Sequence, residues 1–180
     1  DVEVRLTGTN ANARLNGTGQ LQNGSASTFV GSERITFERL KGNILFTSNQ
    51  IQVEQITGFL GGGRVTASGG VLLRNDLKLD RFRFAVQGVN ITAPLPKDFL
   101  TTGNADIEIN GRRTSEEDFT TFISGTINAR RSVYRKDIDL ADLIAGRGDR
   151  SLSTGSGDIG TTNLDIRIVG RNALVVRNNL

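Results

Sequence analysis

Apolar and polar residues alternate over most of the sequence, and this two-residue period is the strongest constraint on what the chain can fold into. Residues 163–180, NLDIRIVGRNALVVRNNL, show it clearly. Leu164, Ile166 and Ile168 occupy even positions, whereas Asp165 and Arg167 occupy odd ones. Successive side chains of a β-strand point to opposite faces of a sheet, so this segment has one apolar and one polar face. The alternation therefore predicts an all-β fold.

The same period recurs along the chain, in DVEVRLTG, RVTASGGVLL, LKLDRFRFAV, NADIEINGRR and FISGTINARR. Within residues 77–91 the apolar positions change parity twice, which predicts bulges at Asp80–Arg81 and at Gln87–Gly88. Helical spacing occurs in KDIDLADLIAG, residues 136–146, so one short helix is expected. The Gly- and Ser-rich residues 146–161 predict a flexible loop.

Composition adds two further constraints. The chain has 22 Gly and 2 Pro in 180 residues, and many of the glycines fall inside or at the ends of the alternating segments. Glycine permits a strand to bend, and bends repeated over many strands let a sheet curl. The length suits a single domain spanning residues 1–180, which begins directly on an alternating segment. We expect it to be a segment of a longer polypeptide.

Catalytic, metal and cofactor sites are not expected. The chain has no Cys and no His, so disulfides, thiolate ligands, imidazole ligands and the usual nucleophile–base pairs are excluded. The acidic clusters EED (116–118) and DIDLAD (137–142) are interpreted as a solvated turn and a helix cap. GSGDIG (155–160) matches a dinucleotide-binding pattern but leads into a strand rather than a helix.

Charge gives no indication of a nucleic-acid partner. The chain has 22 Lys and Arg against 19 Asp and Glu, and the signs alternate along the predicted strands. A nucleic-acid-binding protein usually concentrates positive charge on one face. With one Tyr and no Trp, the chain also offers few aromatic platforms for stacking bases. The charges therefore indicate a solvated face of the sheet.

Several segments, in order, resemble the TamB-type translocation and assembly module proteins of the AsmA-like superfamily. They are GTGQLQNGSAS, GSERITFERLKGNILF, GFLGGGRVTASGGVLL, ISGTINARRSVYRKDIDLADLI and LDIRIVGRNALVVRNNL. The last two are the most typical of the family, and they suggest a stretch from its C-terminal region. The resemblance covers most of the chain and rests on no catalytic motif.

The resemblance implies a fold, a function and a location. The fold is a long curled sheet, mostly antiparallel, that forms an open half-pipe with an apolar interior. The function is to shield phospholipid acyl chains during transport between the inner and outer membranes, and to support outer-membrane protein assembly with a TamA-type barrel. The location is the periplasm of a diderm bacterium, with an inner-membrane anchor outside this segment.

On this interpretation the apolar side of the strands lines a groove that binds lipid. The parity of the alternating segments selects its residues: Val71, Phe82, Phe84, Ile107, Ile109, Ile127, Ile166 and Ile168. An alternative stays open, in which the sheet closes into a sandwich or barrel with a self-filled core. That protein would be a structural or adhesive module that binds protein or glycan.

Overall fold

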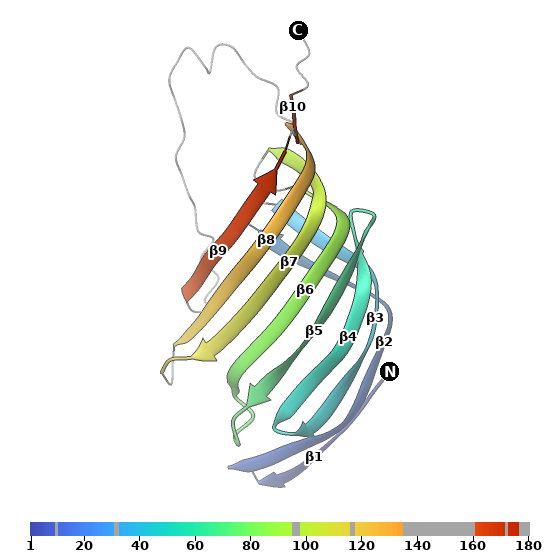
Figure 1. The fold of residues 1–180 in the computed structure, drawn as a ribbon. Coiled ribbons are helices and arrows are strands. Elements are labelled where there is room, and N and C mark those ends of the chain that lie inside the picture. The colour runs from blue at the N-terminus through green and yellow to red at the C-terminus, as the bar shows by residue number, and fades with distance from the viewer. Residues whose placement is uncertain are drawn as a thin grey trace.

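The described part of the chain is a single open β-sheet. The computed structural model describes residues 1–9, 11–30, 33–94, 98–115, 118–134, 161–171 and 173–176. These residues form a ten-stranded, strongly twisted sheet (Figure 1). None of them is helical, and no helix that could cross a membrane occurs among them. The predicted all-β, mostly antiparallel sheet is thereby confirmed.

The strands follow one another in space as they do in the sequence. The order is β1-β2-β3-β4-β5-β6-β7-β8, with antiparallel pairing throughout. β9 and β10 both pair with the far edge of β8, and both are parallel to it. The bounds are β1 Val2–Thr9, β2 Asn12–Val30, β3 Glu33–Ser48, β4 Gln50–Leu60, β5 Gly63–Leu73, β6 Leu79–Ala93, β7 Phe99–Arg113, β8 Phe119–Tyr134, β9 Thr161–Gly170 and β10 Leu174–Val176.

Two sequence predictions concern the connection from β8 to β9. The helix expected at 136–146 lies outside the described residues. The loop expected at 146–161 does so as well, except for its last residue. Thr161 is the first residue of β9 and pairs with Thr120, so the loop boundary was placed one residue too far.

Bulges keep the apolar residues on one side where the sequence parity shifts. Leu72 faces Arg81 and Leu73 faces Leu79, so Asp80 is an extra residue in β6, as predicted. The second irregularity follows Gly88, which still pairs in register, and falls at Val89 and Asn90. The prediction of Gln87–Gly88 was wrong by two residues. Asn90 has a φ of 54°, a conformation that Asn tolerates better than most residues.

The described residues enclose little buried core. Seven apolar residues are buried, and no described side chain has less than 2% of its surface exposed. The best-packed group is Ile35, Leu60 and Val65, with Phe37 against them. A sheet of one layer buries each apolar side chain mainly against its neighbours on the same face, which accounts for the small core.

The sheet depends on glycine where the backbone adopts a positive φ inside a strand. Gly125 in β8 has a φ of 148°. A Cβ at this position would collide with the carbonyl oxygen of Asp106 and lie 2.9 Å from the Cα of Ile107 on β7. Gly70 in β5 is a suitable comparison, because a Cβ there would meet only the carbonyl oxygen of Ile51, at 3.2 Å.

We expect Gly125→Ala to lower the free energy of unfolding by about 2 kcal/mol, because the substitution forces strained backbone against β7. Gly70→Ala should change it by less than about 1 kcal/mol. Urea unfolding followed by circular dichroism measures both. Equal effects of the two substitutions would contradict this explanation.

Candidate functional site

The eight residues predicted to line a groove lie on one face of the sheet. Residues directly opposite each other in a ladder point to the same face, as do residues two apart on one strand. The register joins the eight through the following pairs: Val71 with Phe82, Phe84 with Ile109, Ile107 with Gly125, Gly125 with Ile166, and Ile127 with Ile168. We call this surface the apolar face.

The apolar face also extends over strands that the sequence analysis left out of the groove. On β3 and β4, Phe46 faces Ile51 and Ile44 faces Val53, and Ile51 in turn faces Val71. The same alternation in NILFTSNQIQVEQ, on both sides of the β3–β4 turn, was the signal that could have found them. β1 continues the face through three alternate residues: Val2, Val4 and Leu6. The face therefore runs from β1 to β9.

Large apolar side chains lie over glycines of the neighbouring strand. Phe82 faces Gly111, and a Cβ at Gly111 would collide with the Phe82 ring and lie 2.6 Å from that of Phe119. The two rings stack, with centroids 5.6 Å apart. Phe84 lies in the same way over Gly69, whose Cβ would come within 2.6 Å of its ring. The sequence analysis interpreted these glycines as bends, but they also make room for aromatic rings on the apolar face.

None of the eight predicted residues is buried. The six on β5 to β8 are half-buried, and Ile166 and Ile168 on β9 are exposed. Exposure is greatest at the two edges of the sheet: Val2 on β1 is 70% exposed and Leu164 on β9 is 69% exposed. Most of the apolar face is thus accessible over the described residues, and its exposure is greatest along the edges.

A shallow hollow of about 390 Å³ interrupts the apolar face where β9 gives way to β10. Its lining combines aromatic, aliphatic and small residues: Phe99, Ala129, Ser132, Ile168, Gly170, Ala173 and Leu174. The Phe99 ring packs against the ring of Tyr134, the residue opposite it on β8, with centroids 5.1 Å apart. The hollow is a recess of mainly apolar character that an alkyl group could enter.

The opposite face of the sheet is mainly polar, although Leu45 and Phe122 are exposed on it. Arg83 lies 3.0 Å from the carboxylate of Glu108 on the next strand, and the amide of Asn110 donates to the same carboxylate at 2.7 Å. These two hydrogen bonds, with the smaller effect of the Arg83 charge, hold the pKa of Glu108 below its usual value. The pair is largely exposed, so it keeps this face solvated and contributes little to stability.

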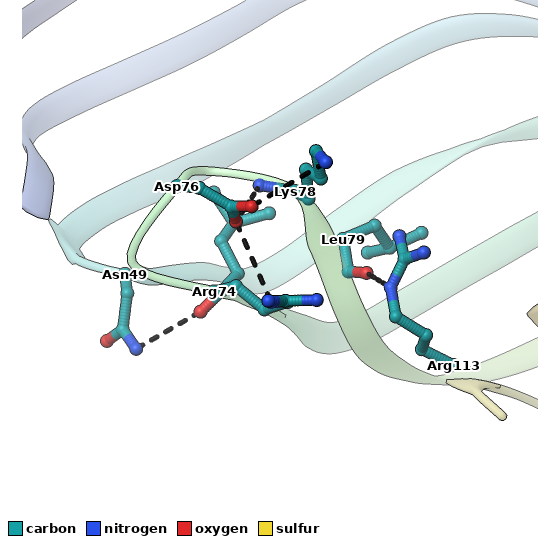
Figure 2. Close-up of polar contacts among 7 residues, drawn as sticks. Asn49, Arg74, Asp76, Lys78, Leu79 and Arg113 are labelled. Carbon is teal, nitrogen blue, oxygen red and sulfur yellow. Dashed lines mark hydrogen bonds and ion pairs between the residues drawn. The ribbon is translucent and has the colours of Figure 1, made fainter. Parts of the chain in front are cut away.

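A loop at one end of the sheet is held by a second charged group. Residues 74–78, between β5 and β6, fold around Asp76 (Figure 2). Its carboxylate accepts from the backbone N–H of Lys78 at 3.2 Å and lies 3.8 Å from both the Arg74 and the Lys78 side chains. Desolvation acts to raise the pKa of Asp76, but the hydrogen bond and the two cations outweigh it, so the pKa is lowered.

The same loop joins strands that are not neighbours in the sheet. The carbonyl oxygen of Asn75 accepts from the backbone N–H of Ala13 at the start of β2, at 2.9 Å. Asn49, in the β3–β4 turn, donates through its side chain to the carbonyl of Leu73 and accepts the Leu73 N–H through its own carbonyl. Polar groups therefore connect three hairpins at this end, where the apolar face stops.

The described residues offer no catalytic or metal-binding constellation. No three His, Cys, Asp or Glu side chains among them are placed to hold a metal ion. Of the EED cluster, Asp118 lies in the described residues and forms a turn, in which it exchanges hydrogen bonds with the Ser115 hydroxyl. The remaining acidic positions considered above, 116–117 and 137–142, lie outside the described residues, as does GSGDIG.

Comparison with known protein families, characterised proteins and solved structures gives no match to this chain.

The lowered pKa values of Asp76 and Glu108 predict how the free energy of unfolding depends on pH. Both pKa values are lowered in the folded state, so each group stabilises the fold above its unfolded pKa and loses that contribution as the pH falls through its folded pKa. We expect the free energy of unfolding to decrease between about pH 5 and pH 3, and to decrease less steeply in the Asp76→Asn, Glu108→Gln double variant. Urea titrations at several pH values test this. An identical pH dependence in both proteins would contradict it.

Proposed function

We propose that the apolar face binds phospholipid acyl chains and shields them from water, as one segment of a groove that carries lipid between two membranes. The observation that supports this most directly is the continuity of the face from β1 to β9, with most of its described side chains half-buried or exposed. A surface of this kind is typical of an interaction site rather than of a finished core.

Energetics favour an apolar occupant. Each Å² of apolar surface left in water costs about 25 cal/mol, and each CH₂ group moved out of water gains about 0.8 kcal/mol. An acyl chain laid on the face relieves both costs without requiring a polar partner from the protein. Nine strands side by side, β1 to β8 followed by β9 or β10, span roughly 40 Å across the sheet at about 4.8 Å per strand. This width exceeds the roughly 15 Å of hydrocarbon in one bilayer leaflet. An acyl chain therefore fits along the face in more than one position.

We further propose that the sheet curves along its length into a half-pipe with the apolar face inside. Bulges or irregularities occur in the ladders between β2 and β8, and a bulge bends its strand and increases the local twist. The bond from Ala13 to Asn75 links β2 with the β5–β6 loop and favours the same curvature at one end. The polar β5–β6 loop would then form the rim of the groove.

The remaining elements of the proposal come from the resemblance to TamB-type proteins. They are a periplasmic location in a diderm bacterium, an inner-membrane anchor outside this segment, and support of outer-membrane protein assembly with a TamA-type barrel. In this proposal the protein is not an enzyme and needs no cofactor. Its polar face, where Arg83 and Glu108 neutralise each other, favours contact with water over contact with nucleic acid.

Site-specific photo-crosslinking tests lipid binding directly. With a benzophenone amino acid at Ile107 or Ile166, in protein produced in the periplasm, we expect phospholipid adducts detectable by mass spectrometry. Glu108 and Asp165, one residue along the same strands, point to the polar face and are the matched controls. Equal labelling on both faces, or no lipid at Ile107 and Ile166, would contradict the proposal. Protein adducts alone at these positions would favour the adhesive alternative.

Substitutions at two neighbouring residues of β8 distinguish the effect of a charge on the apolar face from an effect on folding. We expect Ile127→Asp to lower the lipid recovered with the purified protein about tenfold, because a carboxylate among acyl chains is poorly solvated. Asn128→Asp, on the exposed opposite face, should retain lipid. Circular dichroism must show the same strand content in both variants. Retention of lipid by folded Ile127→Asp protein would contradict the proposal.

A further inference from the structure

We infer that β1 and β9 are complementary edges, through which a second copy of this chain pairs head to tail and continues the sheet. In the described part of the chain, β1 pairs only with β2 and β9 pairs only with β8, so each exposes one row of backbone N–H and C=O groups. An unpaired edge is a template for another strand. The inference concerns the edges of the sheet that the described residues form, and it does not depend on what the apolar face binds. In a longer polypeptide, a neighbouring strand of the same chain would compete with the second copy for either edge.

The direction of the strands suits this pairing. Seven antiparallel pairs lead from β1 to β8, so these two strands run in opposite directions, and β9 is parallel to β8. When a second copy is placed beside the first in the same orientation, its β1 therefore runs antiparallel to β9. The apolar residues of both strands then lie on the same side, and the apolar face continues without a break from one copy to the next.

One register matches both edges along the full length of β1. It places the eight residues of Val2–Thr9 against residues 161–168. The last residue of β1, Thr9, then lies opposite the first residue of β9, Thr161. The apolar pairs are Leu6 with Leu164, Val4 with Ile166, and Val2 with Ile168. On the polar face, this register puts Arg5 opposite Asp165 and Glu3 opposite Arg167. Opposite charges directly across a ladder stabilise it.

The hydrogen-bonding pattern of β1 brings these charged side chains close together. Asp1 and Gln20 exchange two backbone hydrogen bonds, of 2.8 and 2.7 Å. Such pairs alternate along an antiparallel ladder, so the backbone groups of Glu3 and Arg5 point toward β2, and those of Val2 and Val4 point to the free edge. Glu3 and Arg5 would therefore form non-hydrogen-bonded pairs with β9, the pairs in which side chains lie closest.

Other registers are disfavoured by the same residues. A shift of two residues in one direction puts Asp165 opposite Glu3, and a shift of two in the other puts Arg167 opposite Arg5. Like charges directly opposite are destabilising. A shift of one residue puts apolar residues on the polar face. The charge pattern of the two edges thus selects a single register.

Pairing between like edges is the rival arrangement. Two β1 strands, centred on Val4, would also oppose Glu3 to Arg5, and two β9 strands, centred on Ile166, would oppose Asp165 to Arg167. Either like-edge contact alone is two-fold symmetric and stops at a dimer, whereas the head-to-tail contact uses different edges and leaves one of each free for the next copy. Growth through both like-edge contacts together is excluded by the double charge variant described below, which opposes like charges in each of them. The size of the assemblies and this variant together distinguish the arrangements.

Sedimentation velocity of the 180-residue chain over a range of concentrations tests the inference. We expect species beyond the dimer that grow with concentration at low salt, and a shift toward monomer at high salt because the edge charges are exposed. A monomer at every concentration would overturn the inference. Assembly that stops at the dimer would overturn it in favour of like-edge pairing.

Charge variants then test the register. Arg5→Glu opposes Asp165 with a second carboxylate and should weaken association about fivefold or more. The double variant Arg5→Glu, Asp165→Arg makes β1 wholly acidic and β9 wholly basic on the polar face. It should restore head-to-tail association and abolish both like-edge contacts. Arg14→Glu, the same charge change on exposed β2, is the matched control.

Each outcome of these variant experiments either supports or overturns the proposed register. Loss of association in Arg5→Glu with recovery in the double variant supports the proposed register. Loss without recovery, or an equal loss in the Arg14→Glu control, overturns it. Circular dichroism confirms that each variant is folded, so a failure to associate is separated from a failure to fold.

Discussion

The structure depends on one constraint, which is that residues facing each other across a β-ladder must point to the same side. Every strand from β1 to β9 carries most of its apolar residues on alternate positions, and the register brings these positions into continuous rows. A slip of one residue in any ladder would send the remaining rows to the wrong face. The bulges at Asp80 and at Val89 and Asn90 absorb such slips where the sequence parity changes.

Glycine contributes to this arrangement in two ways. At Gly125 the backbone itself requires it, because any side chain would strike β7. At Gly111 and Gly69 it provides the space in which Phe82 and Phe84 lie across the neighbouring strand. Large rings that lie along the sheet give a low and continuous apolar surface without a second layer of structure. The absence of bulky residues at these positions is therefore as important to the surface as the aromatic rings themselves.

Alternation in the sequence predicted the all-β fold, the grouping of the eight residues on one face and the bulge at Asp80, because strand parity is a local property. Features that depend on distant contacts were not predictable in this way. The parallel pairing of β9 with β8 joins Thr120 to Thr161, and the bond from Ala13 to Asn75 joins hairpins far apart in the sequence. The residues of the apolar face on β3 and β4 were missed although their alternation was visible.

The order of the strands also bears on how a protein of this kind changes in evolution. From β1 to β8 each strand forms its ladders only with the strands next to it in the sequence, so every hairpin occupies one continuous stretch of the sheet. Loss or duplication of one hairpin would remove or add two strands, about 10 Å of sheet, and leave the direction and facing of the others unchanged. Homologues are thus free to differ in length by whole hairpins while keeping one uninterrupted apolar side.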